Sequence, residues 1–153
     1  MDALKNPQSI ILLILAAAAV FAAVYAAIRL LSRRRAEELR SRVGTDFEKY
    51  CAAILEDAGF ENVRLTRASG DYGVDLLAEK DWITWAFQCK CYDGPVGIKA
   101  VQEIYSGRDF YHCHVGVVMT NSIFTSAAEN LAQSHNILLW DGDFLQTLAG
   151  EER

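Results

Sequence analysis

Two stretches of the sequence decide the fold: Gly73-Val74-Asp75-Leu76-Leu77-Ala78 and Phe87-Gln88-Cys89-Lys90. The first puts an acidic residue at the start of an apolar strand, and the second puts an amide and a lysine at the end of another. Between the strands, Glu79-Lys80-Asp81 is a short polar segment typical of a turn, so the two strands form a predicted β-hairpin. Side chains alternate along a strand with a period of two, and Gln88 and Lys90 therefore share one face. Pairing of the strands brings Asp75 beside both.

An acid, a second oxygen ligand and a lysine at one strand edge can hold a divalent ion against a phosphate. Mg²⁺ prefers oxygen ligands, which suits Asp75 and the amide oxygen of Gln88. The amide adds no charge, so it binds Mg²⁺ more weakly than a carboxylate does. Lys90 can orient a water and stabilise charge that develops on the phosphate. The alternative for Asp75 and Gln88 is that they are exposed polar strand residues, and the alternative for Lys90 is that it protects a sheet edge from pairing. The apolar sequence around Asp75, Gly73-Val74-Asp75-Leu76-Leu77, favours the functional interpretation.

The chain after residue 44 shows the alternation of helices and strands that is typical of an α/β domain. A helix is predicted from Thr45, its N-cap, to about Ala58, and the hairpin turn is predicted at Glu79-Lys80-Asp81. The remaining predicted elements are strands at 62–67, 74–79 and 82–91, a helix at 98–111, a strand at 115–120, a helix from 125 or 126 to 134, a strand at 137–140 and a short helix from 144. This order, αβββαβαβ, predicts an α/β sandwich with a mixed central sheet.

These motifs together resemble the Mrr-like branch of the restriction-endonuclease-like nucleases, the PD-(D/E)xK group. The resemblance covers roughly Gly44 to Leu148 and rests on the order and spacing of five pieces. They are Gly44-Thr45-Asp46-Phe47-Glu48, Ser69-Gly70-Asp71-Tyr72-Gly73-Val74-Asp75, Gln88-Cys89-Lys90, Thr120-Asn121 and Ile137-Leu138-Leu139-Trp140-Asp141-Gly142. The resemblance implies an αβββαβ restriction-endonuclease-like core. It also implies a Mg²⁺-dependent DNA endonuclease, with Mn²⁺ as a substitute metal, that restricts foreign DNA.

The resemblance further implies which residues form the site. Asp75, Gln88, Lys90 and Glu48 would be catalytic, and the metal would be held by Asp75, Gln88, Glu48 and the backbone carbonyl of Cys89. Glutamine at position 88 departs from the carboxylate in the group's general name but matches the Mrr-like branch. Glu48 has a second interpretation, because it also completes a T-x-x-E capping box at the start of its helix.

Three more polar residues lie near these motifs. Asp71 matches an acid in the family's turn, although a turn-forming role before Tyr72-Gly73 is favoured. Gln102 and Glu103 lie on the helix after the motif, which in the family contributes near the site. We take both as neighbours of the predicted site.

Residues Ile10 to Ile28 form an unbroken run of apolar or small residues. At 1.5 Å per residue this run is about 28 Å long as a helix, close to the hydrocarbon core of a bilayer. We predict a tail at 1–8, a transmembrane helix at 9–30, a basic juxtamembrane helix or linker at 31–43 and a nuclease domain at 44–153. A signal peptide would have a shorter apolar core with its charge in front. A buried helix would need more covering structure than this chain offers.

Arginines follow the apolar run rather than precede it, at Arg29 and at Arg33-Arg34-Arg35. The positive-inside rule therefore predicts a single-pass protein of the inner or cell membrane whose C-terminal domain is cytoplasmic. Membrane lipid would then be a partner of residues 9–30.

The charge is uneven along the chain. Residues 1–43 carry seven Lys/Arg and three acidic residues, a net charge of +4, whereas residues 44–153 carry eight and 17, a net charge of −9. Binding to duplex DNA depends on neutralising phosphates, so this charge argues against a DNA partner. The argument is weaker if basic residues such as Lys90, Lys99 and Arg108 gather on one face, or if bound cations offset Glu48 and Asp75. The charge favours the alternative of a non-catalytic DNA-binding or tethering module on a nuclease fold. A membrane interaction protein is a third option, and a homodimer, which would ease cutting of both strands, is left open.

Four cysteines, Cys51, Cys89, Cys91 and Cys113, show no C-x-x-C spacing. A zinc cluster of Cys89 and Cys91 with His112-Cys113-His114 is an alternative, but zinc sites usually need such pairs, and buried thiols on adjacent strands are favoured.

Three tryptophans, Trp82, Trp85 and Trp140, could stack on nucleic-acid bases, but core packing is favoured for all of them.

Overall fold

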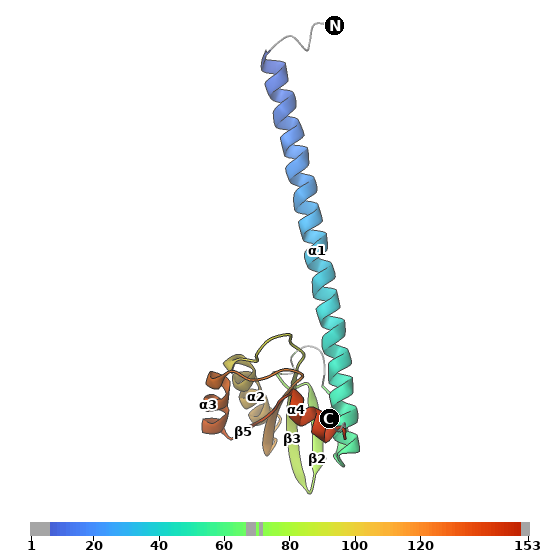
Figure 1. The fold of residues 1–153 in the computed structure, drawn as a ribbon, viewed down its shortest axis with the longest axis vertical. Helices are drawn as coiled ribbons and strands as arrows, with labels where there is room; N and C mark the ends of the chain where they lie inside the picture. The colour runs from blue at the N-terminus through green and yellow to red at the C-terminus, as the bar shows by residue number, and fades with distance from the viewer. Residues whose placement is uncertain (1–6, 67–69, 71, 151–153) are drawn as a thin grey trace. The chain divides into compact units, whose positions relative to one another are not determined.

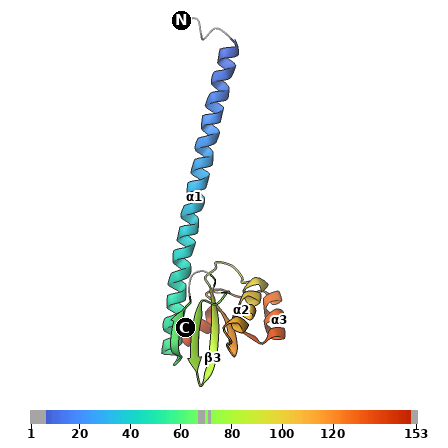
Figure 2. The same cartoon turned by 180° about the vertical axis from the view of Figure 1, so that it is seen from behind.

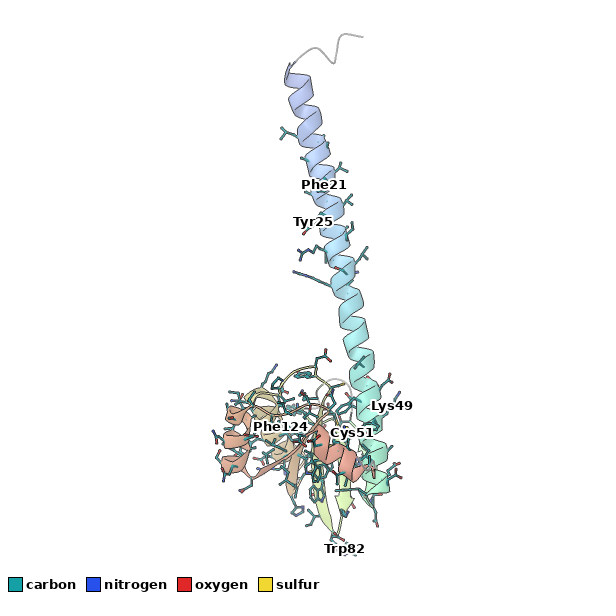
Figure 3. The ribbon with its side chains drawn as sticks, in the orientation of Figure 1. Phe21, Tyr25, Lys49, Cys51, Trp82 and Phe124 are labelled. Atoms are coloured by element: carbon teal, nitrogen blue, oxygen red, sulfur yellow. The ribbon has the colours of Figure 1, made fainter. Side chains whose placement is uncertain are left out.

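The computed structural model describes residues 7–66, 70 and 72–150. The chain divides into two compact units, Met1–Ser41 and Arg42–Arg153. The first unit consists of the greater part of helix α1, which spans Pro7–Asp57. Within it, Leu15–Arg34 has a mean hydropathy of 1.9 and none of it is buried, as the side chains of Phe21 and Tyr25 illustrate (Figure 3). By length and composition this segment is able to cross a membrane.

The second unit is built on a five-stranded mixed sheet. Its strands are β1 (Glu61–Leu65), β2 (Leu76–Lys80), β3 (Ile83–Lys90), β4 (Val115–Thr120) and β5 (Ile137–Trp140), in the spatial order β1-β2-β3-β4-β5. The first three strands pair antiparallel, and β3, β4 and β5 pair parallel. Its helices after α1 are α2 (Ile98–Phe110), α3 (Ser126–His135) and α4 (Gly142–Leu148) (Figure 1). The predicted α/β architecture with a mixed central sheet is confirmed.

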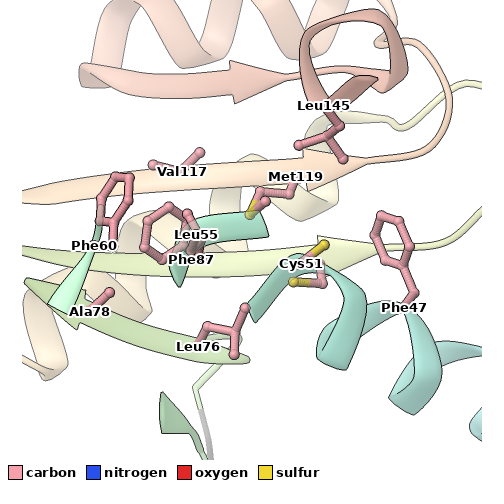
Figure 4. Packing of buried hydrophobic residues seen from close by; sticks show 11 residues of the cluster. Phe47, Cys51, Leu55, Phe60, Leu76, Ala78, Phe87, Val117, Met119 and Leu145 are labelled. Carbon is pink, nitrogen blue, oxygen red and sulfur yellow. The ribbon is translucent and has the colours of Figure 1, made fainter. Parts of the chain in front are cut away.

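Helices cover both faces of the sheet, and each face has its own core. The last turns of α1 and helix α4 cover one face, where Phe47, Cys51 and Leu145 pack against the strands (Figure 4). Helices α2 and α3 cover the other face (Figures 1 and 2). Strand β3 contributes to both cores, Phe87 to the first and Ala86 to the second. A strand buried on both faces explains why its sequence is a nearly continuous apolar run.

The predicted helix start at Thr45 is wrong. Helix α1 runs from Pro7 to Asp57 without a break, so Thr45 lies inside it. A continuous helix satisfies its interior N–H groups with the carbonyls one turn back, and only the first four N–H groups of a helix need a cap. The single glycine in this stretch, Gly44, costs only about 1 kcal/mol in a helix interior, which is too little to end it.

The sequence predicts the hairpin turn at Glu79-Lys80-Asp81, and the structure places it slightly later, because each flanking strand bound lies one residue further along the chain. Strand β2 continues to Lys80, and the turn consists of Asp81 and Trp82, which have φ angles of 52° and 65°. Two successive residues with positive φ are typical of the tight hairpin turns whose twist matches that of the strands. The turn leaves Trp82 fully exposed (Figure 3), so the prediction that it packs in the core is wrong. Trp85 and Trp140 do pack against the core on the α1 side, as predicted.

Candidate active site

The hairpin brings Asp75 to the end of β3, as its sequence predicts. Asp75 lies directly before β2, and its backbone N–H donates a hydrogen bond of 2.8 Å to the carbonyl of Phe87. The backbone N–H of Cys89 donates to Oδ2 of Asp75 over 2.6 Å. The Asp75 carboxylate is therefore directed at the Gln88-Cys89-Lys90 segment.

Gln88 is buried in the sheet on the side of α2. Only 1% of its surface is exposed, so the alternative of an exposed strand residue is wrong. Its Nε2 donates a hydrogen bond of 2.7 Å to Oε2 of Glu103 on α2. Its Oε1 is buried and has no hydrogen-bond partner among the described residues. A buried acceptor without a partner is costly, about 1–3 kcal/mol, and such an oxygen suits a cation.

Lys90 shares its face of β3 with Gln88, and both side chains meet the same carboxylate. Nζ of Lys90 lies 3.1 Å from Oε2 of Glu103, and Nζ of the exposed Lys99 lies 3.5 Å from Oε1. These lysines and the carboxylate border a small pocket of about 80 Å³. Arg108 does not join them, because it pairs with Asp109. Of Lys90, Lys99 and Arg108, the first two therefore gather at this carboxylate.

The pKa of Glu103 is lowered from its usual value. Partial burial acts to raise it, but the hydrogen bond and the charge of Lys90, the hydrogen bond from Gln88 and the charge of Lys99 together outweigh burial. Glu103 is therefore ionised at neutral pH and can only accept hydrogen bonds.

The end of β4 fixes the chain that follows Lys90. Oγ1 of Thr120 donates a hydrogen bond of 2.7 Å to the carbonyl of Lys90. The side chain of Asn121 accepts from the N–H of Tyr92 at 2.8 Å and donates to the carbonyl of Tyr92 at 3.1 Å. The Thr120-Asn121 motif thus holds the strand end that carries the lysine.

Two glycines allow helix α2 to approach the loop before Asp75. Gly73 has a φ of 78°, and a Cβ atom there would lie 2.7 Å from Cβ of Glu103. A Cβ atom on Gly107 of α2 would lie 2.5 Å from the carbonyl oxygen of Tyr72. Glycine is needed at position 73 both for its left-handed backbone and for this close contact. Asp71, two residues before Gly73, lies outside the described residues.

Glu48 reaches the same region from α1. Its carboxylate is one of the charges that raise the pKa of the Cys89 thiol. The capping-box interpretation of Glu48 fails, because the helix does not begin at Thr45. Its role as a metal ligand stays a prediction.

The thiol of Cys89 belongs to the core on the α1 side rather than to a metal site. A hydrogen bond with Cys51 raises its pKa, and burial, the charge of Cys51 and the carboxylates of Asp75 and Glu48 raise it further. The thiol is therefore protonated at neutral pH when no metal is bound, and its side chain is packed among the buried residues of that core. The ligand that the sequence predicts at this position is the backbone carbonyl of Cys89.

The cysteines and histidines of the zinc alternative have other contacts. Sγ of Cys113 lies 3.8 Å from the carbonyl of Tyr111, and Nδ1 of His114 lies 2.7 Å from Oγ1 of Thr84. Within the described part of the chain, no group of three His, Cys, Asp or Glu side chains is arranged to hold a metal ion. A metal at the candidate site would thus depend on amide and backbone oxygens in addition to carboxylates. The buried, unpartnered Oε1 of Gln88 fits that kind of ligand set.

Glu103 is the site residue that sequence reasoning undervalued. It lies on the buried stripe of α2, three residues after the buried Ala100 and four before the buried Gly107. A charged residue on the buried stripe of an amphipathic helix needs a partner, and this was the available signal.

The chain belongs to the Mrr-type family of restriction endonucleases. The model of this family's catalytic domain, described as a restriction endonuclease, matches residues 39–149, which is most of the chain. This extent agrees with the range over which the sequence resembles that family. No curated protein matches the chain.

Solved structures are similar to the chain at low sequence identity. The protein of unknown function AF1548 has a TM-score of 0.56 at 22% identity, and the match covers 67% of this chain and 65% of that one. The DNA modification-dependent restriction endonuclease AspBHI has a TM-score of 0.54 at 22% identity, and the match covers 73% of this chain but 33% of AspBHI. The restriction endonuclease MspJI, solved with a 27-mer oligonucleotide, has a TM-score of 0.45 at 20% identity, with 76% and 27% covered. The first two likenesses show the fold, and the chain spans about a third of the length of AspBHI.

Proposed function

We propose that the chain is a metal-dependent DNA endonuclease anchored in a membrane. The observation that carries this proposal is the buried Oε1 of Gln88, which has no partner among the described residues and lies at a strand end that also presents Asp75 and Lys90. A purely structural glutamine would pair both ends of its amide, because an unpaired buried acceptor is costly. Membership in a restriction-endonuclease family supports the same conclusion.

In this proposal Asp75, Gln88, the carbonyl of Cys89 and Glu48 hold a divalent ion, Mg²⁺ or Mn²⁺. A metal held by these residues would supply Lewis-acid chemistry: polarisation of the phosphate, a lower pKa of an attacking water and stabilisation of the leaving oxygen. The Asp75 carboxylate supplies the charge that a neutral glutamine lacks.

Lys90 supplies the positive charge next to the phosphate. Its ammonium stabilises the negative charge that develops on the phosphate oxygens during attack. The pocket of about 80 Å³ beside it is bordered by a second lysine, Lys99, which favours an anionic occupant. We infer that a DNA phosphate lies against this pocket, and that restriction of foreign DNA is the biological use of the cut.

The apolar segment of α1 supports the membrane anchor. We propose that it crosses the membrane once with the arginines Arg29 and Arg33 to Arg35 on the cytoplasmic side, where DNA is accessible. Reporter fusions at Arg153 test this topology, and activity of the reporter outside the cytoplasm alone would contradict it. Homodimer formation stays a prediction.

The decisive experiment is plasmid cleavage by the full chain in lipid nanodiscs, with Mg²⁺, Mn²⁺ or EDTA. We expect nicked or linear DNA with either metal and intact DNA with EDTA. The net charge of −9 on residues 44–153 favours the second candidate, a non-catalytic DNA-binding or tethering module. Retention of DNA by the protein without any cleavage in either metal would support that candidate instead.

A further inference from the structure

We propose that Glu103 is a positioning residue. It determines which end of the Gln88 amide is available to a metal, and it holds the Lys90 ammonium beside that amide. This inference rests on the proposed nuclease function and adds a residue to it. The observation behind it is that one carboxylate oxygen, Oε2 of Glu103, meets both Nε2 of Gln88 at 2.7 Å and Nζ of Lys90 at 3.1 Å.

A glutamine amide has two ends of nearly equal shape and opposite hydrogen-bonding character. Its oxygen accepts and can bind a cation, whereas its NH₂ group donates and repels one. An ionised carboxylate accepts only, so Glu103 selects the orientation in which the NH₂ group of Gln88 faces α2. The oxygen is then left on the far side, and this is the buried Oε1 that has no partner among the described residues.

Glu103 is itself held in place by its surroundings. Lys99 lies 3.5 Å from its second carboxylate oxygen. Gly73 packs so closely against its Cβ that the loop before Asp75 leaves no room for a side chain there. The carboxylate therefore stands at a fixed position behind the Gln88 amide.

The contact also compensates for the missing charge on the ligand. A hydrogen bond to an ionised group is stronger than one between neutral groups, and linked hydrogen bonds polarise one another. The negative charge of Glu103 on the NH₂ side draws the amide proton and increases electron density on Oε1. A neutral amide thus becomes a better ligand for a divalent cation.

Reversal of this hydrogen bond tests the inference. We compare the parent with Glu103→Gln, Gln88→Glu and the double variant Gln88→Glu/Glu103→Gln, using the full chain in nanodiscs. Mn²⁺ binding is measured by calorimetry without DNA, and cleavage is measured separately. Loss of partners that orient metal ligands typically weakens binding about 10- to 100-fold, and we expect this for Glu103→Gln. Gln88→Glu should also be impaired, because two carboxylates then face each other.

The double variant should recover Mn²⁺ binding to at least the parent level. In it, the amide at position 103 donates to the carboxylate at position 88, so the hydrogen bond is restored with donor and acceptor exchanged. A residue that only stabilises the fold would not give this rescue. The matched control is Glu129→Gln on α3, an exposed glutamate, which should bind Mn²⁺ as the parent does.

The outcomes separate this inference from the proposed function. A parent that binds Mn²⁺ and shows the rescue, yet cuts no DNA, supports the positioning role and overturns the nuclease. A parent that cuts DNA while Glu103→Gln binds and cuts equally well overturns the positioning role alone. A double variant that binds as weakly as Glu103→Gln also overturns it, and a parent that binds no Mn²⁺ overturns both.

Discussion

The Cys89 N–H donates to Oδ2 of Asp75 over 2.6 Å, so the two strands of the hairpin are joined at the site by a side chain. This bond separates the structural and chemical roles of Asp75. Asp75→Asn keeps an acceptor for the N–H but removes the charge, whereas Asp75→Ala removes both. We expect both variants to lose cleavage by at least about 100-fold. Only Asp75→Ala should lose about 1–3 kcal/mol of unfolding free energy, measured by denaturant titration. Cleavage at the parent rate by Asp75→Asn would remove Asp75 from the site.

Lys90 and Lys99 pair with the same carboxylate but differ in exposure, at 22% and 87% of their side chains. Lys90→Ala should lower the maximal cleavage rate by at least about 100-fold, because its charge faces the reacting phosphate. Lys99→Ala should leave the maximal rate within a few-fold and raise the DNA concentration required, because an exposed ion pair contributes little. Steady-state kinetics on a short duplex distinguishes the two. Equal loss of maximal rate in both would contradict the assignment.

Glu48 can be tested without a capping complication, because Thr45 lies inside a continuous helix. Glu48→Gln preserves size and helix propensity and removes a charge that acts on the Cys89 thiol. We expect an unchanged melting temperature, a higher Mg²⁺ requirement and slower cleavage. Glu56→Gln, at an exposed position of the same helix, is the control. If a metal titration of Glu48→Gln matches the parent, the ligands reduce to Asp75, Gln88 and Cys89.

Two glycines with nearly the same backbone conformation provide a matched pair. Gly70 and Gly73 have φ angles of 76° and 78°, but a Cβ atom on Gly70 meets nothing within 4 Å, whereas one on Gly73 would meet Glu103. Gly70→Ala should cost about 1–2 kcal/mol from the left-handed backbone alone. Gly73→Ala should cost about 1–3 kcal/mol more from overpacking and should also reduce Mn²⁺ binding. Equal stability of the two variants would show that α2 does not pack closely enough against this loop to exclude a side chain at position 73.

The lowered pKa of Glu103 gives stability a pH dependence with a definite sign. The folded protein favours the ionised carboxylate, so the contribution is fully present above the unfolded pKa of about 4.3. It is lost as the pH falls through the lower pKa of the folded state. Glu103→Gln should therefore lose less stability than the parent between pH 5 and the acid range below pH 4, as measured by urea unfolding. Parallel curves for the two proteins would contradict the ion pair with Lys90.

Much of the sheet could be predicted, because its strands are apolar runs bounded by turn residues. The bounds of β4 (Val115–Thr120) and β5 (Ile137–Trp140) agree with the prediction, and the hairpin brings the Asp75 carboxylate to the backbone N–H of Cys89, between Gln88 and Lys90 in the sequence. These features depend on local pattern and on period-two alternation, which the sequence carries directly.

The rest depends on contacts between distant residues or on competition between local signals. The partner of Gln88 is Glu103, which lies 15 positions later on another element. The buried stripe of α2 indicates that Glu103 faces the sheet, but no local pattern indicates which sheet residue it contacts at that distance. At Thr45 the sequence carries a local capping signal, but the helix continues through this residue. Trp82 is exposed because it lies in the hairpin turn, although an indole usually tends to be buried.

Asp75, Gln88, Lys90 and Glu103 all come from one contiguous segment, β2-β3-α2 with the residues just before it. Proteins open in cooperative units that often coincide with such supersecondary motifs. One sub-global opening of this segment would then disperse the four side chains together. Amide hydrogen exchange in this segment therefore reports directly on the fraction of molecules whose site is assembled.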